Sequence, residues 1–323
     1  MREVVFLKNN EDRWRKLEQG LANNDVRDPD KLSEMFIQLT DDLSYARTFY
    51  PGTKTVDYLN ELAFKLHTEL YKNKNQPLRN VLQFWKTGLP LLIYKHRYKV
   101  LYAFLMFFLA GCLGAFSAAN DDSFIRLILG DGYVNETIDN IESGKPMDIY
   151  GSSNEGDMFV FITINNIKVS FLAFVFGIFL SYGTFYLLLS NGIMLGSFLY
   201  FFYERSLLLT ASLSIWMHGV FEITAIVIAG AAGLVMGNSI LFPKTYSRGV
   251  SFLMGAREGA KIVLGLVPFF IVAGFTESFL TRKAPDYPVL AITIISSTAI
   301  FVAWYFIIYP RMLGRRITSQ YAA

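Results

Sequence analysis

The chain has 323 residues and a net charge of +3, and 53% of its residues are hydrophobic. Charged residues make up 18% of the chain, below the roughly 25% usual in soluble domains. This deficit is uneven, because residues 1–97 are charged like a soluble segment whereas apolar runs of membrane-spanning length dominate from Tyr98 onward. The nearly balanced charge excludes a general affinity for nucleic acid. The single cysteine, Cys112, excludes an intrachain disulfide and a cysteine metal cluster.

These features predict an all-α protein: a polytopic membrane helix bundle of about six transmembrane helices, preceded by a small cytoplasmic helical bundle. The N-terminal sequence MREVVFLKNNEDRWRKLEQ is charged from its second residue, so we expect no signal peptide. The first apolar helix is then expected to act as its own insertion signal.

Residues 1–76 predict a cytoplasmic bundle of three helices. The first helix ends in WRKLEQGL, which begins at Trp14, and Asp28-Pro29 supplies an N-cap and an N-terminal proline for the second. Apolar residues recur at helical spacing in the second and third helices, on either side of a break at Pro51-Gly52; they are Leu32, Met35, Phe36, Leu39, Leu43 and Ala46, then Val56, Leu59, Ala63, Leu66 and Leu70. A bundle this small is expected to lean on a partner or on the membrane.

Residues 77–97 predict an amphipathic interfacial helix, an elbow that lies on the membrane before the chain turns into it. Apolar side chains are mixed with Arg79 and Lys86 in this segment, and the basic run Lys95-His96-Arg97 follows. The basic run indicates that this end of the first span is cytoplasmic. A second interpretation treats the segment only as the flank of that span, and the sequence favours neither.

Residues 98–310 predict the transmembrane bundle, whose first span begins at Val100. The loop 119–158 follows and holds nine acidic residues but only two basic ones, Arg126 and Lys145. Because lysine and arginine collect on the cytoplasmic side of membranes, this acidic loop is expected to be extracytoplasmic. The later unbroken spans are expected at 167–190, 221–241, 262–280 and 288–309.

The segment 191–217 has two apolar pieces separated by Glu204-Arg205. The flanking segments are both expected in the cytoplasm, so the chain must cross an even number of times between them. We therefore expect a third span that is broken or re-entrant, covered by protein or lining water. Six spans put both termini in the cytoplasm, with residues 311–323 as a cytoplasmic tail.

Polar side chains from three predicted spans fall at one depth, in the outer leaflet. His218 and Glu222 lie four residues apart and share a face of the fourth span. Glu277 reaches a similar depth near the end of the fifth span. The start of the second span contributes the remaining members of this predicted cluster, which are Asn165, Asn166 and Lys168.

Two interpretations of the cluster stay open. Ionisable groups inside membranes usually face a bundle interior or a cavity. In the first interpretation, the cluster lines a cavity that opens outward, where Lys168 neutralises one carboxylate. In the second, an internal salt bridge only fixes the positions of the helices, as polar contacts between membrane helices often do.

A metalloenzyme is not expected. The pattern H-x-x-x-E at His218 differs from the H-E-x-x-H of zinc proteases, and a catalytic zinc needs three protein ligands with a partner that orients them. Glu277 is a candidate third ligand, whereas His67 and His96 are expected on the cytoplasmic side. We predict no catalytic residue, no metal and no cofactor.

Small residues predict close helix packing. Ala229, Gly233 and Gly237 recur every four residues along the fourth span, with Gly230 beside them, and Gly192 and Gly196 repeat the spacing earlier in the chain. Such grooves let another helix approach the backbone closely. We expect them to pack helices of the same chain, with a homodimer as the alternative, and we expect the fourth span to be central.

Three stretches together resemble the stage II sporulation protein M family: LLLSNGIMLG from Leu187, HGVFEITAIVIAGAAGL from His218 and FIVAGFTESFLT from Phe270. The first helix with Trp14 and the YLNEL piece at Tyr58 are similar to the helical cytoplasmic part of its longer members. This resemblance covers nearly the whole chain. The family gives no chemical role to the positions that match its motifs, which are Asn191, Gly192, His218, Gly219, Glu222, Gly233 and Glu277.

The resemblance implies a bacterial or archaeal inner-membrane protein without known catalysis. In spore formers the namesake acts in engulfment and anchors peptidoglycan-degrading partners at the septal membrane. Longer relatives in bacteria that do not sporulate are often encoded beside an AAA+ ATPase and von Willebrand-factor-type proteins.

We therefore expect a non-enzymatic scaffold, surrounded by membrane lipids, that binds envelope-remodelling or ATPase-associated protein partners. The alternative is a translocator of a lipid-linked or small amphipathic solute. An intramembrane hydrolase is a remote third hypothesis.

Overall fold

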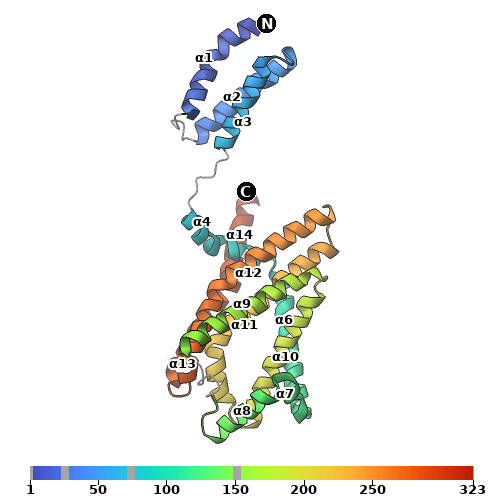
Figure 1. Ribbon diagram of the computed structural model, residues 1–323, viewed down its shortest axis with the longest axis vertical. Coiled ribbons are helices and arrows are strands. Elements are labelled where there is room, and N and C mark those ends of the chain that lie inside the picture. The colour runs from blue at the N-terminus through green and yellow to red at the C-terminus, as the bar shows by residue number, and fades with distance from the viewer. Residues whose placement is uncertain (1–2, 23–28, 71–76, 148–153, 323) are drawn as a thin grey trace. The chain divides into compact units, whose positions relative to one another are not determined.

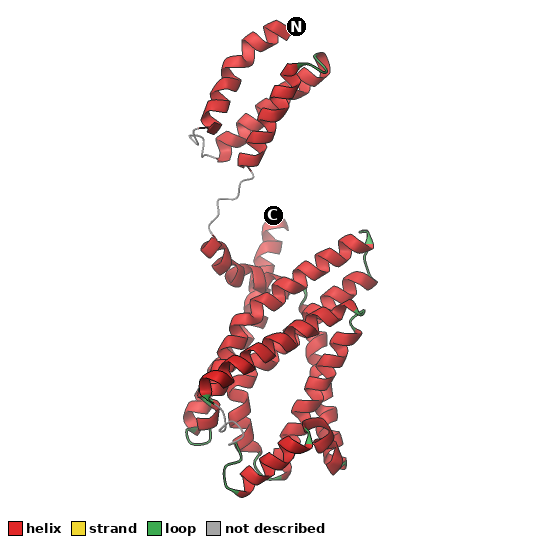
Figure 2. Ribbon diagram, in the orientation of Figure 1, coloured by secondary structure: helices red, strands yellow, loops and turns green. Residues whose placement is uncertain are grey.

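The computed structural model describes residues 3–22, 29–70, 77–147 and 154–322. All regular secondary structure in these described ranges is helical, as the sequence predicts (Figure 2). The chain divides into two compact units, Met1–Pro77 and Leu78–Ala323.

The N-terminal unit contains the three predicted helices, α1 (Glu3–Ala22), α2 (Pro29–Phe49) and α3 (Lys54–Leu70) (Figure 1). The Asp28 cap lies outside the described residues. The apolar faces of the helices meet in one core, whose buried members are Phe6, Trp14, Leu17, Leu32, Leu39, Leu43, Ala46, Leu59, Leu62 and Leu66.

Trp14 anchors this core. Its indole ring is 2% exposed, and its Nε1 donates a hydrogen bond of 2.8 Å to Oδ2 of Asp42 on α2, which also pairs with Arg13. Because the buried indole N–H has a partner, Trp14 joins α1 to α2 without an unsatisfied donor. The unit thus has a hydrophobic core of its own, and its dependence on a partner or the membrane stays a prediction.

The second unit contains six helical spans long and apolar enough to cross a membrane. Short π-helical or 3-10 segments continue two of them. The spans are α6 (Arg97–Asn120), α9 (Glu155–Val175) with η3 (Phe176–Ile178), α10 (Tyr182–Glu204), α11 (Leu208–Leu241), α12 (Arg248–Phe279), and α13 (Pro288–Val302) continued by η5 (Ala303–Ile308) and α14 (Tyr309–Ala322).

The predicted path of the second and third spans is wrong. The expected second span, 167–190, straddles the turn between η3 and α10, where Leu180 and Ser181 adopt φ of 54° and 70°. The sequence does not indicate this turn, because the residues around it, GIFLSYG, are mostly apolar. The third span is neither broken nor re-entrant, since α10 is continuous.

The pair Glu204-Arg205, expected inside a broken span, instead marks the end of α10. The chain turns at Ser206, with a φ of 61°, and α11 begins at Leu208. Residues 191–217 are therefore the second half of one span and the start of the next. The count of six spans is confirmed.

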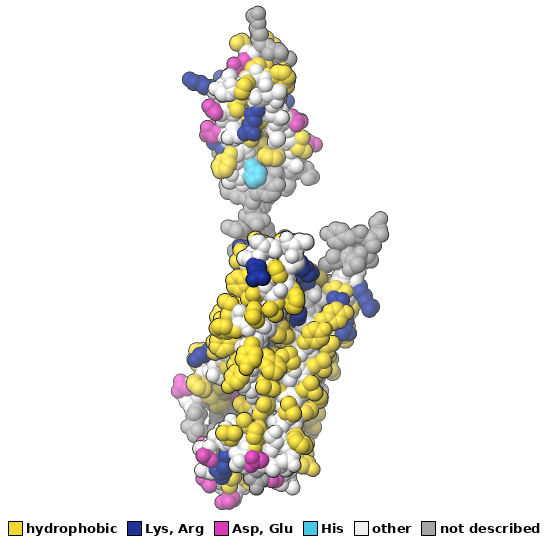
Figure 3. Space-filling model, turned by 90° about the vertical axis from the view of Figure 1, so that its right-hand side faces the viewer, with side chains coloured by type: hydrophobic (Ala, Val, Ile, Leu, Met, Phe, Trp, Pro, Cys, Tyr) yellow, Lys and Arg dark blue, Asp and Glu magenta, His cyan; other side chains and the backbone are white. Residues whose placement is uncertain are grey.

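The two ends of the transmembrane unit differ in charge. Basic side chains gather at one end of the unit, which we call the basic end. They come from the start of the first span, from the turn between α11 and α12, and from the end of the last span, and include Arg97, Lys99, Lys244, Arg248 and Arg311. The acidic end holds α7 (Asp122–Leu129) and α8 (Asp131–Glu142), which lie within the predicted acidic loop 119–158. Figure 3 shows apolar side chains covering the surface between the ends. This belt is the face expected of a protein surrounded by lipid.

The predicted elbow is α4 (Pro77–Gln83), η1 (Phe84–Gly88) and α5 (Leu89–Lys95), and it packs on the bundle. Trp85 Nε1 donates to the Gly265 carbonyl at 2.9 Å, and Tyr305 donates its hydroxyl to the Trp85 carbonyl at 2.6 Å. Leu89 is fully buried against the same helices. The side chains of residues 77–79, including Arg79, lie outside the described residues. The elbow is thus held by α12 and η5, and its place at the membrane surface stays a prediction.

Helix bounds do not coincide with two predicted segment boundaries. Helix α9 begins at Glu155, inside the predicted loop 119–158. Helix α14 continues the last span through the predicted tail 311–323 as far as Ala322. The predicted sides of the membrane for both segments stay predictions.

Helix α11 is central in the bundle, as predicted. In its most apolar stretch 67% of the residues are buried, against 22% in α6 and 17% in the last span. It contacts α6, α9, α10, α12 and α13. A long apolar helix with five packed neighbours is expected to hold them in register.

Glycines carry the closest contacts of the bundle. A Cβ on Gly233 of α11 would overlap the Ala173 carbonyl of α9, and a Cβ on Gly196 of α10 would overlap the Gly111 carbonyl of α6. The other predicted packing residues lie at the same contacts: Gly192 against Phe107 and Ala110, Gly230 against Leu188, Gly237 against Ser181, and Ala229 fully buried. These grooves therefore act within one chain.

We expect Gly196→Ala to lower the free energy of unfolding by about 1–3 kcal/mol, because the added methyl group forces α6 and α10 apart. The matched control is Gly249→Ala on α12, where a Cβ meets open space. Thermal unfolding of both purified variants in detergent measures the difference. Equal midpoints for the two variants would contradict the backbone contact.

Candidate functional site

Three helices bring polar side chains together inside the transmembrane unit. Asn166 comes from α9, His218 and Glu222 from α11, and Glu277 from α12. One imidazole nitrogen and one oxygen of each carboxylate lie within 4.8 Å of one another. The side chains of His218 and Glu277 are only 8% and 12% exposed, and Asn166 is buried as well. We call these four residues the polar cluster.

A threonine fixes the orientation of the His218 ring. Nδ1 of His218 lies 3.0 Å from Oγ1 of Thr281, in η4 (Thr281–Lys283), and the Thr281 hydroxyl donates to the Thr276 carbonyl at 3.2 Å. If that hydroxyl donates its one hydrogen to Thr276, its oxygen is left to accept from His218, and the imidazole hydrogen is then on Nδ1. In the neutral ring Nε2 then carries no hydrogen. Its lone pair points towards Glu277, with 3.8 Å between Nε2 and Oε2.

The two carboxylates have no lysine or arginine partner within the described part of the chain. Glu222 interacts with the side-chain amide of Asn166, and the ion-pair distance of Glu277 is to His218 alone. The cluster thus offers electron-pair donors from two carboxylates and a neutral imidazole, with no cationic side chain among the described residues to balance them. Such an arrangement is costly in a membrane interior unless protons or a cation balance it.

Lys168 does not neutralise the cluster, contrary to the first interpretation. Its side chain is exposed, as is that of Asn165, whereas Asn166 between them is buried. At about 100° per residue on a helix, Lys168 lies some 200° around α9 from Asn166 and therefore faces away. Asn165 and Lys168 are outside the cluster.

Buried hydroxyl groups flank the cluster on each of its helices. Ser214 precedes His218 by one turn, Ser278 follows Glu277, and Thr163 and Ser170 lie one turn on either side of Asn166. The hydroxyl oxygens of these four residues have no hydrogen-bond partner among the described residues. Unsatisfied buried hydroxyls are rare in folded proteins and indicate polar surroundings beyond the side chains themselves.

Thr281 was not identified from the sequence. It lies four residues after Glu277 in TESFLT, so the helical spacing that links His218 to Glu222 also links these two. A threonine at such a spacing is too common in membrane helices to stand out by itself.

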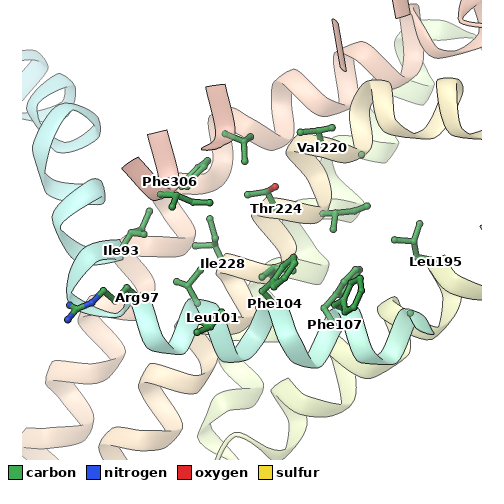
Figure 4. Close-up of a pocket in the computed structure, with 18 of the residues that line it drawn as sticks. Ile93, Arg97, Leu101, Phe104, Phe107, Leu195, Val220, Thr224, Ile228 and Phe306 are labelled. Carbon is green, nitrogen blue, oxygen red and sulfur yellow. The ribbon is translucent and has the colours of Figure 1, made fainter. Parts of the chain in front are cut away.

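The large cavity of the transmembrane unit lies on another side of α11. This apolar groove has a volume of about 750 Å³ and lies between α6, α11 and the last span, with Phe104 and Phe107 pointing into it (Figure 4). Arg97 and Arg311 lie in its lining at the basic end. Val220 and Thr224 form its wall on α11, while His218, Glu222 and Glu277 do not line it.

Fold and site together define a multi-pass α-helical membrane protein with a buried polar cluster between three spans and a separate helical unit before them. The model of the Stage II sporulation protein M family matches residues 103–282, more than half of the chain. The chain belongs to this family. A second match, to a domain of unknown function (DUF8413), covers residues 4–72. No curated protein and no solved structure matches the chain.

We expect Thr281→Val to lower the free energy of unfolding by about 1–3 kcal/mol, because the buried His218 Nδ1–H loses its acceptor. Thr281→Ser keeps the oxygen and should lose much less. Thr293→Val serves as a control, since Thr293 is exposed on α13 and bonds only its own helix. Thermal unfolding in detergent compares the three, and a Thr281→Val midpoint equal to that of Thr293→Val would contradict the assigned contact.

Proposed function

We propose that this protein is a non-enzymatic membrane scaffold that holds partners at the envelope of a bacterial cell. The observation that carries the proposal is the division of the chain into two parts of different kinds. One part is a helical unit with its own hydrophobic core, and the other is a tightly packed membrane bundle. A bundle whose helices are in backbone contact is rigid, and an anchor for protein partners needs a rigid membrane part.

The proposed docking surfaces lie on the soluble parts of the protein. Phe64 on α3 is 72% exposed, and Ile37 on α2 is 59% exposed, although both are large and apolar. At the acidic end Leu127 of α7 is 77% exposed beside the charged residues of α7 and α8. Exposed apolar residues in polar surroundings are typical of protein-interaction sites. The partners we propose are envelope-remodelling or ATPase-associated proteins.

For the orientation we propose that the basic end faces the cytoplasm. Its support is the asymmetry of lysine and arginine, which favour the cytoplasmic side. The even number of spans then places the N-terminal unit and the C-terminus together in the cytoplasm, and α7 and α8 outside.

Cysteine labelling tests this orientation. In a Cys112→Ala background, Glu136→Cys on α8 should react with a membrane-impermeant maleimide in intact cells, because its side chain is exposed at the acidic end. Tyr246→Cys, in the turn after α11, should react only after permeabilisation. The reverse pattern would invert the proposed topology.

Translocation of a lipid-linked solute is the second candidate function, and the apolar groove favours it. Its volume of about 750 Å³ is large enough for acyl chains, and its two arginines suit a phosphate. The groove, rather than the outward polar cavity expected from the sequence, is the feature that a translocator would use.

Photocrosslinking in living cells tests the scaffold. A benzophenone amino acid at Phe64 or Leu127 should give discrete protein adducts, because these positions lie on the proposed docking surfaces. The same amino acid at Phe161, equally exposed on the apolar surface of α9, should give none. Absence of protein adducts at both docking positions would contradict the scaffold.

A groove-filling substitution separates the two candidate functions. Val220→Trp should preserve the adducts and should restore the phenotype of a strain that lacks the chain, because a scaffold does not need the groove. Preserved folding with lost complementation would favour the translocator instead.

A further inference from the structure

The polar cluster presents three electron-pair donors to one point. One imidazole nitrogen of His218 and one oxygen each of Glu222 and Glu277 lie within 4.8 Å of one another, on two helices. We propose that these residues bind one divalent transition-metal ion of the Zn²⁺ class, with Asn166 as an oxygen donor beside it, and that the ion ties α11 to α12. This inference goes beyond the scaffold function and does not depend on it.

The distances favour an ion over a hydrogen bond. The 3.8 Å between His218 Nε2 and Glu277 Oε2 is too long for a hydrogen bond. Zinc binds nitrogen and oxygen at about 2.0–2.2 Å, so two donors on the same ion lie at most about 4.4 Å apart. The three donor atoms, within 4.8 Å of one another, are close to that limit, and small side-chain rotations would bring them inside it.

The charge of the cluster matches a divalent cation. Two carboxylates carry two negative charges when ionised, and the neutral imidazole adds none. No lysine or arginine of the described chain pairs with Glu222 or Glu277, since Lys168 faces away. One divalent ion would neutralise both carboxylates and remove the cost of their burial in hydrocarbon.

The donor types select the class of ion. An imidazole with two carboxylates suits Zn²⁺, Mn²⁺, Fe²⁺ or Co²⁺, whereas Ca²⁺ and Mg²⁺ favour sites made of oxygen alone. The Thr281 contact adds the feature that most metal-binding histidines share, a hydrogen-bond acceptor on the other ring nitrogen. It holds the Nε2 lone pair towards the carboxylates.

The buried hydroxyls give independent support. Ser214 and Ser278 are fully buried next to His218 and Glu277, and their oxygens lack partners among the described residues. Such groups indicate that water or another polar species belongs to this layer.

The site suits a structural ion. Asn166, whose side chain contacts Glu222, would add an oxygen as a fourth donor, and the apolar groove does not reach the three ligand side chains. Structural zinc sites are closed in this way, whereas catalytic sites keep a position open for water. The ion would hold the α11–α12 contact at the acidic end, where α12 stops at Phe279.

Metal content and cobalt spectroscopy of the full chain test the proposal. Protein purified in detergent with its affinity tag removed should contain about one transition-metal ion per chain by mass spectrometry. After removal of the ion with a chelator, Co²⁺ should restore stoichiometric binding and give visible absorption bands from its nitrogen and oxygen ligands. The chelated protein should unfold at a lower temperature, and Zn²⁺ should reverse this shift.

Matched variants assign the ligands. His218→Gln, Glu222→Gln and Glu277→Gln should each weaken Co²⁺ binding by about tenfold or more, as loss of a ligand or its orienting partner does. Glu258→Gln is the control, because Glu258 is also a carboxylate of α12 beside a histidine, His96, but is already paired with Lys95 at the basic end. It should bind Co²⁺ as the unaltered chain does.

Two results would overturn the proposal. One is an unaltered chain that binds well under one Co²⁺ or Zn²⁺ per molecule and unfolds at the same temperature with and without chelator. The other is unchanged affinity in Glu277→Gln. Either result would mean that protons alone balance the two carboxylates. If the variants do not fold, the chelator shift in the unaltered chain decides the question.

Discussion

The close approach of α11 to its neighbours is the constraint on which the rest of the structure depends. Membrane helices gain little from burying apolar surface against each other, because lipid is equally apolar. Gly233 lets α9 touch the α11 backbone, and Gly230 admits Leu188 of α10. When α9 and α12 pack against α11 in this way, Asn166 and Glu277 lie opposite His218 and Glu222. The polar cluster is thus a consequence of small residues placed elsewhere on the same helices.

The cluster in turn restricts how those helices can pack. Its carboxylates have no lysine or arginine partner among the described residues, so a shift of α12 relative to α11 would separate Glu277 from His218 and leave a buried carboxylate without that neighbour. Thr281 extends the same restraint past the end of α12 into η4. Packing by glycine brings the helices close, and the polar side chains then select one register. The acidic and basic ends of the unit are held at fixed positions as a result.

Much of this arrangement is predictable from the sequence, and the limits have physical causes. Apolar runs and Lys/Arg asymmetry indicate six spans, and helical spacing places His218 and Glu222 on one face. The turn at Leu180 and Ser181 is hidden because its residues are as apolar as a span. The pair Glu204-Arg205 has the opposite effect. In the sequence, a charged pair at the end of a helix resembles an interruption within a span. Lys168 was assigned to the cluster by depth alone, and only the rotation of α9 excludes it.

Whether the polar cluster is closed to water is the central question. Ser278→Cys probes it with little disturbance, because Ser278 is fully buried beside Glu277 and the two side chains are similar in size. In a Cys112→Ala background, we expect an impermeant thiosulfonate to leave this cysteine unmodified from either side of the membrane. Modification as fast as that of an exposed cysteine at the acidic end would show an open cavity and contradict a closed joint between α11 and α12.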